Sequence, residues 1–579
     1  MKRCLKFDFL GLKTLDVISL ALRAIKRNYG LSIEVDDIIE IFDKKVFENI
    51  FQKGLTDDIF QFSSPGMKDI LKSFKPETIN VLILLNAVYR PGPIDFIPDI
   101  LKSKNGETKP KYIVDGMDAI LDETYGFPVY QEQIMSLFEL AGFSVGEADN
   151  IRRLMSKKKT DKFLKYQYST DGHKGFVDGM MEKGASEKDA LELWDSLVSF
   201  SKYAFNKSHA TTYAILAYVT AYLKYYFPAE YEAAYLSIKP DEIAKIVNKK
   251  DDFSLKYMLA DINRAEYNFV AEKNKKIIVG FKAIMGFGKG SVETVKQIIS
   301  KRKEKPFTSV KDLLLRTDVD KKMLIGLIKS GSLDKIIPSR RVFFEKYNEE
   351  KTILEHLMNL ISNVRGAENE DKRAEALSRL QEFDFDLFSF SDSQEEMLAF
   401  ENEALGTCIS ADLIDIYEKK GNLVSDAVVG QVQKVFGMIH DANVIIDRNG
   451  KKMAFCKITS GSETAEGVVF AREYASMLFS EGVFSVTGEV TEKYDEYKEM
   501  TVKQIVIKKI EKCKEKSSDF LISLKNEESL IDFDEIISPF LSKGEKNIYL
   551  FQNGQIISTD YYISAKQIKK IPYSYKKIK

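Results

Sequence analysis

The sequence contains few of the side chains that bind zinc or form disulfides. Its 579 residues include four cysteines, which lie far apart without any Cys-x-x-Cys pair, and four histidines in no metal-ligand pattern. This usage is typical of a reducing cytoplasm and argues against zinc fingers. The residues concerned are Cys4, Cys408, Cys456, Cys513, His173, His209, His356 and His440.

Long apolar runs are also missing. The most apolar helix candidate, residues 214–223, is too short to span a bilayer, and Lys224 ends it. The basic start at residues 1–3 superficially resembles a signal peptide, but Asp8 interrupts the apolar stretch and no small-residue cleavage site follows. We therefore expect a soluble cytoplasmic protein that does not bind membranes.

Charge of one sign is not in excess, since the formal net charge is −1. A nucleic-acid partner is not excluded by this balance, because only the local segregation of charge matters for a binding groove. Hydrophobic residues make up 44% of the chain and charged residues 30%. This composition is that of an ordinary globular protein, and the length indicates about three to five domains.

Two periodicities divide the chain. Residues 5–12 alternate as in a strand, whereas residues 35–235 have mainly helical spacing. Residues 428–512 contain short β-branched runs separated by turn residues, a spacing that suits a five-stranded OB-type barrel. The tail, 516–579, mixes both patterns. The predicted fold is multidomain and mainly α, with one β-strand near the start and an OB-type barrel towards the end.

Asp8 stands on the first predicted strand between Phe7 and Phe9. A carboxylate in this position is either a solvated strand residue or a metal ligand. Phosphoryl transfer requires Mg²⁺ held by two or three carboxylates. Asp8 alone therefore does not complete such a site.

Two polar segments are candidates for binding phosphate. Residues 152–159 read Arg-Arg-Leu-Met-Ser-Lys-Lys-Lys, which is either a phosphate-binding helix face or a solvated basic surface. Residues 203–209, Tyr-Ala-Phe-Asn-Lys-Ser-His, precede an apolar helix that Ser208 is placed to cap. Their polar groups would then lie near a helix N-terminus, which favours anions. The alternative is a capping turn with incidental polar groups.

A glycine-rich segment, Gly286-Phe287-Gly288-Lys289-Gly290, lies between helical stretches. Glycines at this spacing let backbone N–H groups approach a DNA phosphate, as in a helix-hairpin-helix unit. An ordinary glycine-rich turn is the alternative interpretation.

In order along the chain, these segments resemble the alpha subunit of bacterial DNA polymerase III, the C-family replicative polymerase. The resemblance covers nearly the whole chain and is carried by motifs that are individually weak but specific as an ordered set. They are Lys6-Phe7-Asp8-Phe9-Leu10-Gly11-Leu12, residues 60–67 (FQFSSPGM), Arg90-Pro91-Gly92-Pro93, Tyr125-Gly126, Tyr130-Gln131-Glu132-Gln133, Arg152-Arg153, Lys157-Lys158-Lys159 and Phe205-Asn206-Lys207-Ser208-His209.

The resemblance implies template-directed DNA synthesis from dNTPs on primed DNA. Asp8 would be a palm ligand of Mg²⁺, and Lys6 would lie near the triphosphate. Nucleotide and template contacts would come from Arg90, Arg152, Arg153, Lys157, Lys158, Tyr203, Asn206, Lys207 and His209, and duplex contacts from Gly286, Gly288, Lys289 and Gly290. In the OB barrel, Phe436, Phe455 and Phe470 are candidates for stacking on single-stranded bases, although barrel-core positions are the favoured interpretation.

The segment Asp384-Phe385-Asp386-Leu387-Phe388 resembles the peptide that docks into the sliding clamp, with Asp384 in place of the usual glutamine. A buried linker is the alternative. The family's tail contacts the clamp loader, but no motif here carries that role. The expected layout is 1–15 palm remnant with the third catalytic aspartate, 16–235 fingers, 236–340 tandem helix-hairpin-helix, 341–427 clamp-binding and linker region, 428–512 OB-fold and 513–579 tail domain.

The family's PHP domain, thumb and Asp-x-Asp half of the palm do not appear before Lys6. Asp-x-Asp pairs occur downstream, beginning at Asp318, Asp384 and Asp532, on the wrong side of the fingers in chain order. We therefore expect a split polymerase in which a second chain supplies these parts. The alternatives are a non-catalytic remnant that binds DNA and the clamp, and a fragment of a longer protein, against which the natural-looking start at Met1 argues mildly.

Overall fold

The chain forms two compact units, which are described separately. They comprise Met1–Glu242 with Lys250–Met323, and Ile243–Lys249 with Leu324–Lys579. A computed structural model describes residues 11–156, 160–201, 205–247, 253–384, 392–411, 413–460, 463–477, 479–480, 482–495, 500–514, 519–523, 547–552, 555–562 and 575–578. The predicted palm strand and several candidate residues lie outside these ranges: Lys6, Asp8, Lys157, Lys158, Tyr203, Phe385, Asp386, Leu387 and Phe388.

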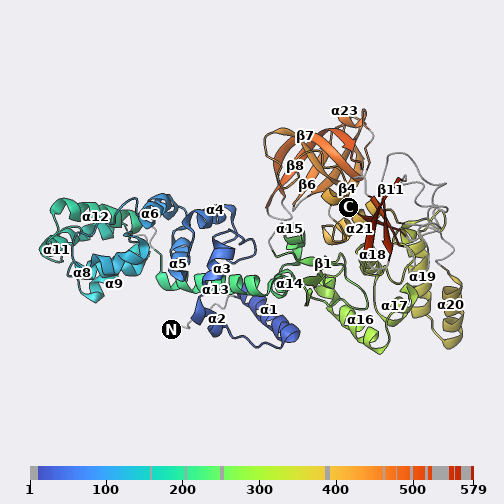
Figure 1. Cartoon of the computed structure of the whole chain (residues 1–579), viewed down its shortest axis with the longest axis horizontal. Helices are drawn as coiled ribbons and strands as arrows, with labels where there is room; N and C mark the ends of the chain where they lie inside the picture. Colours follow the sequence, from blue (N-terminus) through green and yellow to red (C-terminus); the bar gives the residue numbers. More distant parts are fainter. Residues whose placement is uncertain are drawn as a thin grey trace, which may run out of the picture. The chain divides into compact units, whose positions relative to one another are not determined.

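The first unit is mainly helical up to residue 242, as its spacing predicts. The helices α8, α9, α11 and α12 gather into one bundle (Figure 1), in which Trp194 stacks on Phe163 with ring centroids 5.2 Å apart. The helices are α1 (Lys13–Tyr29), α2 (Val35–Ile41), α3 (Lys44–Val46), α4 (Pro65–Phe74), α5 (Ile79–Val88), α6 (Ile97–Lys104), α7 (Met117–Leu121), α8 (Gln131–Leu140), α9 (Val145–Ser156), α10 (Thr160–Phe163), α11 (Phe176–Glu182), α12 (Glu187–Ser201), α13 (Lys207–Tyr226) and α14 (Pro228–Ile238).

Two helices that pack against each other, α5 and α13, contribute to the core of this unit. All side chains of α5 from Val81 to Val88 are buried, so this part of the helix has no solvent face. Lys224 near the end of α13 forms a fully buried ion pair with Asp58 at 2.5 Å and donates to Leu55 O at 3.0 Å. Removing one partner of such a pair would leave an uncompensated buried charge, which costs about 3–5 kcal/mol.

A small sheet and a glycine hairpin complete the first unit. The strands β1 (Lys256–Met258), β2 (Val270–Glu272) and β3 (Lys276–Ile278) lie in the order β1-β3-β2. The β2–β3 pair is antiparallel and packs against α14 and α1. The chain then continues through α16 (Val292–Glu304) and α17 (Val310–Arg316) to α18 (Lys321–Lys329), where the unit boundary falls.

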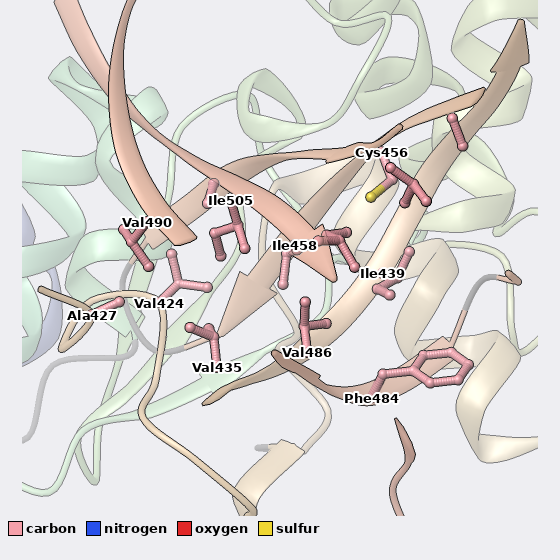
Figure 2. Packing of buried hydrophobic residues seen from close by; sticks show 14 residues of the cluster. Val424, Ala427, Val435, Ile439, Cys456, Ile458, Phe484, Val486, Val490 and Ile505 are labelled. Carbon is pink, nitrogen blue, oxygen red and sulfur yellow. The ribbon is translucent and has the colours of Figure 1, made fainter. Parts of the chain in front are cut away.

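The second unit is built on a closed five-stranded barrel. Its strands are β4 (Val432–Ile446), β5 (Lys452–Ser460), β6 (Glu463–Val469), β7 (Gly482–Asp495) and β8 (Met500–Lys512), in the order β4-β5-β6-β8-β7. The β6–β8 pair is parallel and the other pairs are antiparallel, so the predicted OB-type barrel is confirmed. Figure 2 shows its core, in which Val435, Ile458 and Val486 pack together.

Helices and a second sheet complete this unit. The helices are α15 (Ile243–Val247), α19 (Ile353–Arg365), α20 (Glu370–Glu382), α21 (Gln394–Leu405), α22 (Leu413–Ile416) and α23 (Ala471–Tyr474). In the tail, β9 (Asp519–Ser523), β10 (Asn547–Gln552), β11 (Gln555–Tyr562) and β12 (Tyr575–Ile578) form a sheet in the order β11-β10-β9-β12.

Candidate nucleic-acid interface

The start of α13 brings together residues that are distant in sequence. Gln131 N donates to Phe205 O at 3.0 Å, and Phe205 N donates to Val129 O at 3.3 Å. Asn206 caps the helix, accepting from His209 N at 3.0 Å. The expectation that Ser208 provides the cap is wrong, because the helix already begins at Lys207. The N-terminal end of α13, which favours anions, thus begins directly after Phe205 and its two backbone hydrogen bonds.

A row of aromatic rings in edge-on and tilted contact runs from this end along α13. The guanidinium carbon of Arg90 lies 3.2 Å from the centroid of the Phe205 ring. Ring centroids are 5.3 Å apart for Phe205–His209, 4.3 Å for His209–Tyr213 and 5.1 Å for Tyr213–Phe60. Burial lowers the pKa of Arg90, although an arginine remains protonated at neutral pH. This row of rings presents a cation and aromatic side chains, the groups that bind phosphates and bases.

The polar groups beside this row of rings donate hydrogen bonds to carboxylates. Glu132 accepts from Asn206 Nδ2 and from Lys207 N, both at 3.0 Å. Lys207 Nζ donates to Glu123 at 2.6 Å and lies 5.5 Å from the centroid of the Tyr130 ring. Burial raises the pKa of Tyr130, with a further contribution from the two carboxylates. We call Arg90, Phe205, Asn206, Lys207 and His209 the α13 cluster; its amide and ammonium groups are already engaged by carboxylates.

The sequence pattern does not indicate Glu123 and Glu132 as functional residues. Glu132 belongs to the motif at residues 130–133, but its partner Asn206 lies 74 residues away. Glu123 is likewise 84 residues from Lys207. The motif at residues 130–133 indicated a functional segment. The periodicity of a sequence, however, does not show which residues so far apart along the chain are in contact.

The arginines of the basic segment lie at the end of α9. Arg152 Nη2 and Arg153 Nη2 each lie 2.8 Å from a carboxylate oxygen of Asp149, and Arg153 is the more exposed of the two side chains. The hydrogen bond from Arg152 lowers the pKa of Asp149, so this carboxylate stays ionised in neutral and mildly acidic solution. Both arginines are therefore held by one acidic residue on their own helix.

The glycine hairpin combines a strained and an open position. Gly286 has φ 92°, and a Cβ there would lie 2.9 Å from Lys322 O. Gly288 is exposed and its added Cβ would meet nothing within 4 Å, as is also true of Gly290. The short helix Lys289–Ser291 then leads into α16. Gly286 is thus required by the turn, whereas Gly288 leaves space at the surface for a ligand.

The downstream Asp-x-Asp pair at 318–320 has structural partners. Asp318 accepts from Gln297 Nε2 at 2.7 Å, and Asp320 accepts from Met323 N at 2.8 Å, near the start of α18. Among the residues described, no group of three or more His, Cys, Asp or Glu side chains has the arrangement of a metal site. The described residues therefore do not by themselves fit the two-metal site that the resemblance implies.

The three aromatic candidates of the barrel have different environments. Phe436 is fully buried, but it packs with Leu398 and Tyr417 and not among the residues of the barrel core, so the barrel-core expectation is wrong for it as well. Phe455 is 40% exposed and Phe470 is 49% exposed, so the core expectation is wrong for both. Strand alternation explains Phe455, because its neighbour Ala454 points into the barrel. Phe455 and Phe470 thus remain available for stacking.

Comparison with known families identifies two matches. The bacterial DNA polymerase III alpha subunit finger domain matches residues 14–184, and a helix-hairpin-helix motif matches residues 254–343. These ranges contain Arg90, both carboxylates that contact the α13 cluster and the whole glycine hairpin, whereas residues 205–209 lie outside them. No helix in the described part of the chain has the length and apolar character needed to span a membrane.

Individual relatives agree with the family matches. The DNA polymerase III subunit alpha of Borreliella burgdorferi is 31% identical over 95% of this chain and 49% of its own length. Those of Aquifex aeolicus and Pseudomonas aeruginosa are 31% and 30% identical, over 91% and 84% of this chain and 44% of their own length in each case. The chain therefore spans about half the length of the curated relatives it matches.

Proposed function

Because the chain is homologous to the C-terminal portion of the bacterial DNA polymerase III alpha subunit, we propose that it supplies the fingers and the DNA-holding regions of a replicative DNA polymerase. The observation that carries this proposal is the order of the matches: a finger domain at 14–184 is followed by a helix-hairpin-helix at 254–343. An OB-type barrel, a fold that binds single strands, then follows.

In this proposal the α13 cluster contacts the incoming nucleotide. Arg90 offers its guanidinium beside the Phe205 ring, and Lys207 exchanges the carboxylate of Glu123 for a phosphate oxygen. Asn206 holds the helix start through His209 N and Glu132, so the neighbouring donors keep a fixed direction. Positioning and charge stabilisation are the main tasks of a protein in phosphoryl transfer.

The catalytic carboxylates are proposed to be divided between two chains. Asp8 would contribute one, and a second chain with an Asp-x-Asp palm half, PHP domain and thumb would contribute the others. The pair at Asp318 and Asp320 supports this division, because both carboxylates are already used to hold α16 and α18. Bound Mg²⁺ would provide the charge that activates the primer end and steadies the triphosphate.

Clamp binding by residues 384–388 is proposed as a second contact. Only Asp384 lies within the described residues. The preceding Phe383 is fixed against the rings of Tyr347 and His356, at centroid distances of 5.8 and 5.0 Å. Alanine at Leu387 and Phe388 should abolish binding to a sliding clamp, measured by surface plasmon resonance, while alanine at Ser391 should not. Equal binding by both variants would remove this contact from the proposal.

The proposed activity is tested by primer extension with Mg²⁺ and four dNTPs. The chain alone should not extend the primer, whereas addition of a chain carrying the Asp-x-Asp palm half should restore synthesis. Asp8→Ala should abolish the restored synthesis, and Asp16→Ala, an exposed acid on α1, should leave it unchanged. DNA binding without synthesis under any of these conditions would instead identify a non-catalytic DNA- and clamp-binding protein.

A further inference from the structure

A groove of about 1010 Å³ lies within the first unit, between α1, α14 and the β2–β3 hairpin. It is separate from the α13 cluster and from the glycine hairpin, since it contains no residue of either. Its volume is at the upper end of the range for small-ligand sites, and charged side chains from all three elements line it beside apolar ones. This chemistry favours a charged, extended ligand.

The walls of the groove are held in place by hydrogen bonds. Arg27 Nη2 and Asn28 Nδ2, at the end of α1, both donate to Ala271 O on β2 at 3.0 Å. Asn28 Nδ2 also lies 2.8 Å from Glu230 Oε1 on α14. The hairpin turn is fixed by Asn274 and Lys275, which have φ angles of 67° and 59°. The walls of the groove are thus formed by α1, α14 and the β2–β3 hairpin, which hydrogen bonds hold together.

The acidic residues that line the groove have partners. Glu230 accepts from Asn28, Glu266 from Arg302 Nη2 at 3.0 Å, and Glu272 from Arg264. The pairing leaves these carboxylates already neutralised or hydrogen-bonded, so they offer little to a cationic ligand.

Of the five basic residues that line the groove in the described structure, three are not paired in this way, whereas Arg27 donates to Ala271 O and Arg264 pairs with Glu272. Arg23 lies on α1, Lys273 in the turn and Lys276 on β3, and within the described part of the chain their side chains have no ion-pair or hydrogen-bond partner. Arg23 is exposed and therefore ready to contact a ligand. A guanidinium fork and two ammonium groups around one polar groove match phosphate oxygens.

We propose that this groove binds the phosphate backbone of a DNA strand, as an additional contact beyond the glycine hairpin at residues 286–290. The inference rests on the proposed function, and it is favoured over an acidic protein segment because Lys273 and Lys276 lie within the matched helix-hairpin-helix region. Each phosphate contact releases condensed counterions, so the groove contributes affinity that falls as salt rises.

The test uses the full chain and a fluorescein-labelled primed template, with anisotropy titrations at several salt concentrations. The triple variant R23Q/K273Q/K276Q should weaken binding about tenfold at moderate salt and reduce the log–log salt slope by about 2 to 3. A triple variant of other exposed lysines in the same unit, K26Q/K44Q/K72Q, should change the slope by less than about 1. The charge-retaining variant R23K/K273R/K276R should bind like the wild type, which separates loss of charge from misfolding.

Each other outcome is decisive. If the groove variant binds like the wild type while Gly288→Ala weakens binding, the groove proposal is overturned and the proposed function stands. If the wild type itself does not bind primed DNA, the proposed function fails together with the groove. If DNA binding is unchanged but binding of fluorescein-labelled poly-glutamate is lost, the groove is a site for an acidic polypeptide, which also overturns the proposal.

Discussion

The α13 cluster and the α1–α14 groove both contain basic side chains. As far as the structure describes the chain, Lys207 of the cluster is paired with a carboxylate, whereas Arg23 and Lys273 of the groove are not. In the cluster, Lys207 is engaged by Glu123, and its backbone N–H by Glu132. In the groove, Arg23 and Lys273 face solvent space without a carboxylate partner among the described residues. A phosphate must displace a carboxylate to reach Lys207 but not to reach the groove. The cluster is therefore suited to selecting and positioning a ligand, and the groove to general affinity.

The largest effect is expected from removing the carboxylate that holds the cluster. Glu132→Ala leaves Asn206 Nδ2 and Lys207 N without their acceptor, so we expect the free energy of unfolding of the first unit to fall by about 2–3 kcal/mol. Urea denaturation followed by tryptophan fluorescence measures this change, because Trp194 lies in that unit. The matched control is Glu139→Ala on the exposed face of the same helix, which should cost less than about 0.5 kcal/mol. Equal losses would show that the cluster is not held by Glu132.

A second prediction extends the comparison to the barrel, where Phe455 is exposed as the groove cations are. Phe455→Ala should weaken binding of a fluorescent single-stranded oligonucleotide by about 1–3 kcal/mol, the usual value for one stacked base. Val444→Ala, at another exposed barrel position, should have no effect. Unchanged affinity of Phe455→Ala in the full chain would show that the exposed ring has another role.

A third prediction separates strain from ligand access in the glycine hairpin. Gly286→Ala should destabilise the protein by at least about 1 kcal/mol, because its φ is 92° and the new Cβ would collide with Lys322 O. Gly288→Ala should leave the melting temperature unchanged but reduce affinity for duplex DNA severalfold, since its Cβ enters the space that a phosphate would occupy. Calorimetry and anisotropy measure the two effects. Tight duplex binding by a stable Gly288→Ala protein would exclude this hairpin as a DNA contact.

The smallest effect is expected where charges are already compensated. Lys207→Gln and Arg153→Gln should each change the salt slope of primed-DNA binding by less than about 1, because each side chain already has a carboxylate partner. Anisotropy titrations compare them with the groove triple variant. A slope change as large as that of the groove variant would contradict the distinction between the two regions.

The sequence predicted those features that are recorded in local patterns. Alternation and turn residues indicated the barrel at 428–512, and the glycine spacing indicated the hairpin at 286–290. The helical region was equally clear, but its cap was misplaced at Ser208, because Asn206 and Ser208 are both good N-caps and the pattern does not distinguish them.

The sequence did not predict features that depend on contacts between distant segments. Arg23 and Lys273 look like ordinary solvated charges, and only folding places them across one groove. Phe455 was expected in the core because an aromatic residue in a strand is usually buried. Its exposure follows from the register, which places Ala454 inside instead.

The most direct test of this account is a steady-state kinetic comparison in the proposed two-chain polymerase, with dNTP and primed DNA titrated separately. Lys207→Gln should raise the KM for dNTP and leave the KM for DNA unchanged, whereas R23Q/K273Q/K276Q should raise the KM for DNA and leave the KM for dNTP unchanged. If both variants change the same KM, the compensated cluster and the open groove do not have separate roles, and the central claim is wrong.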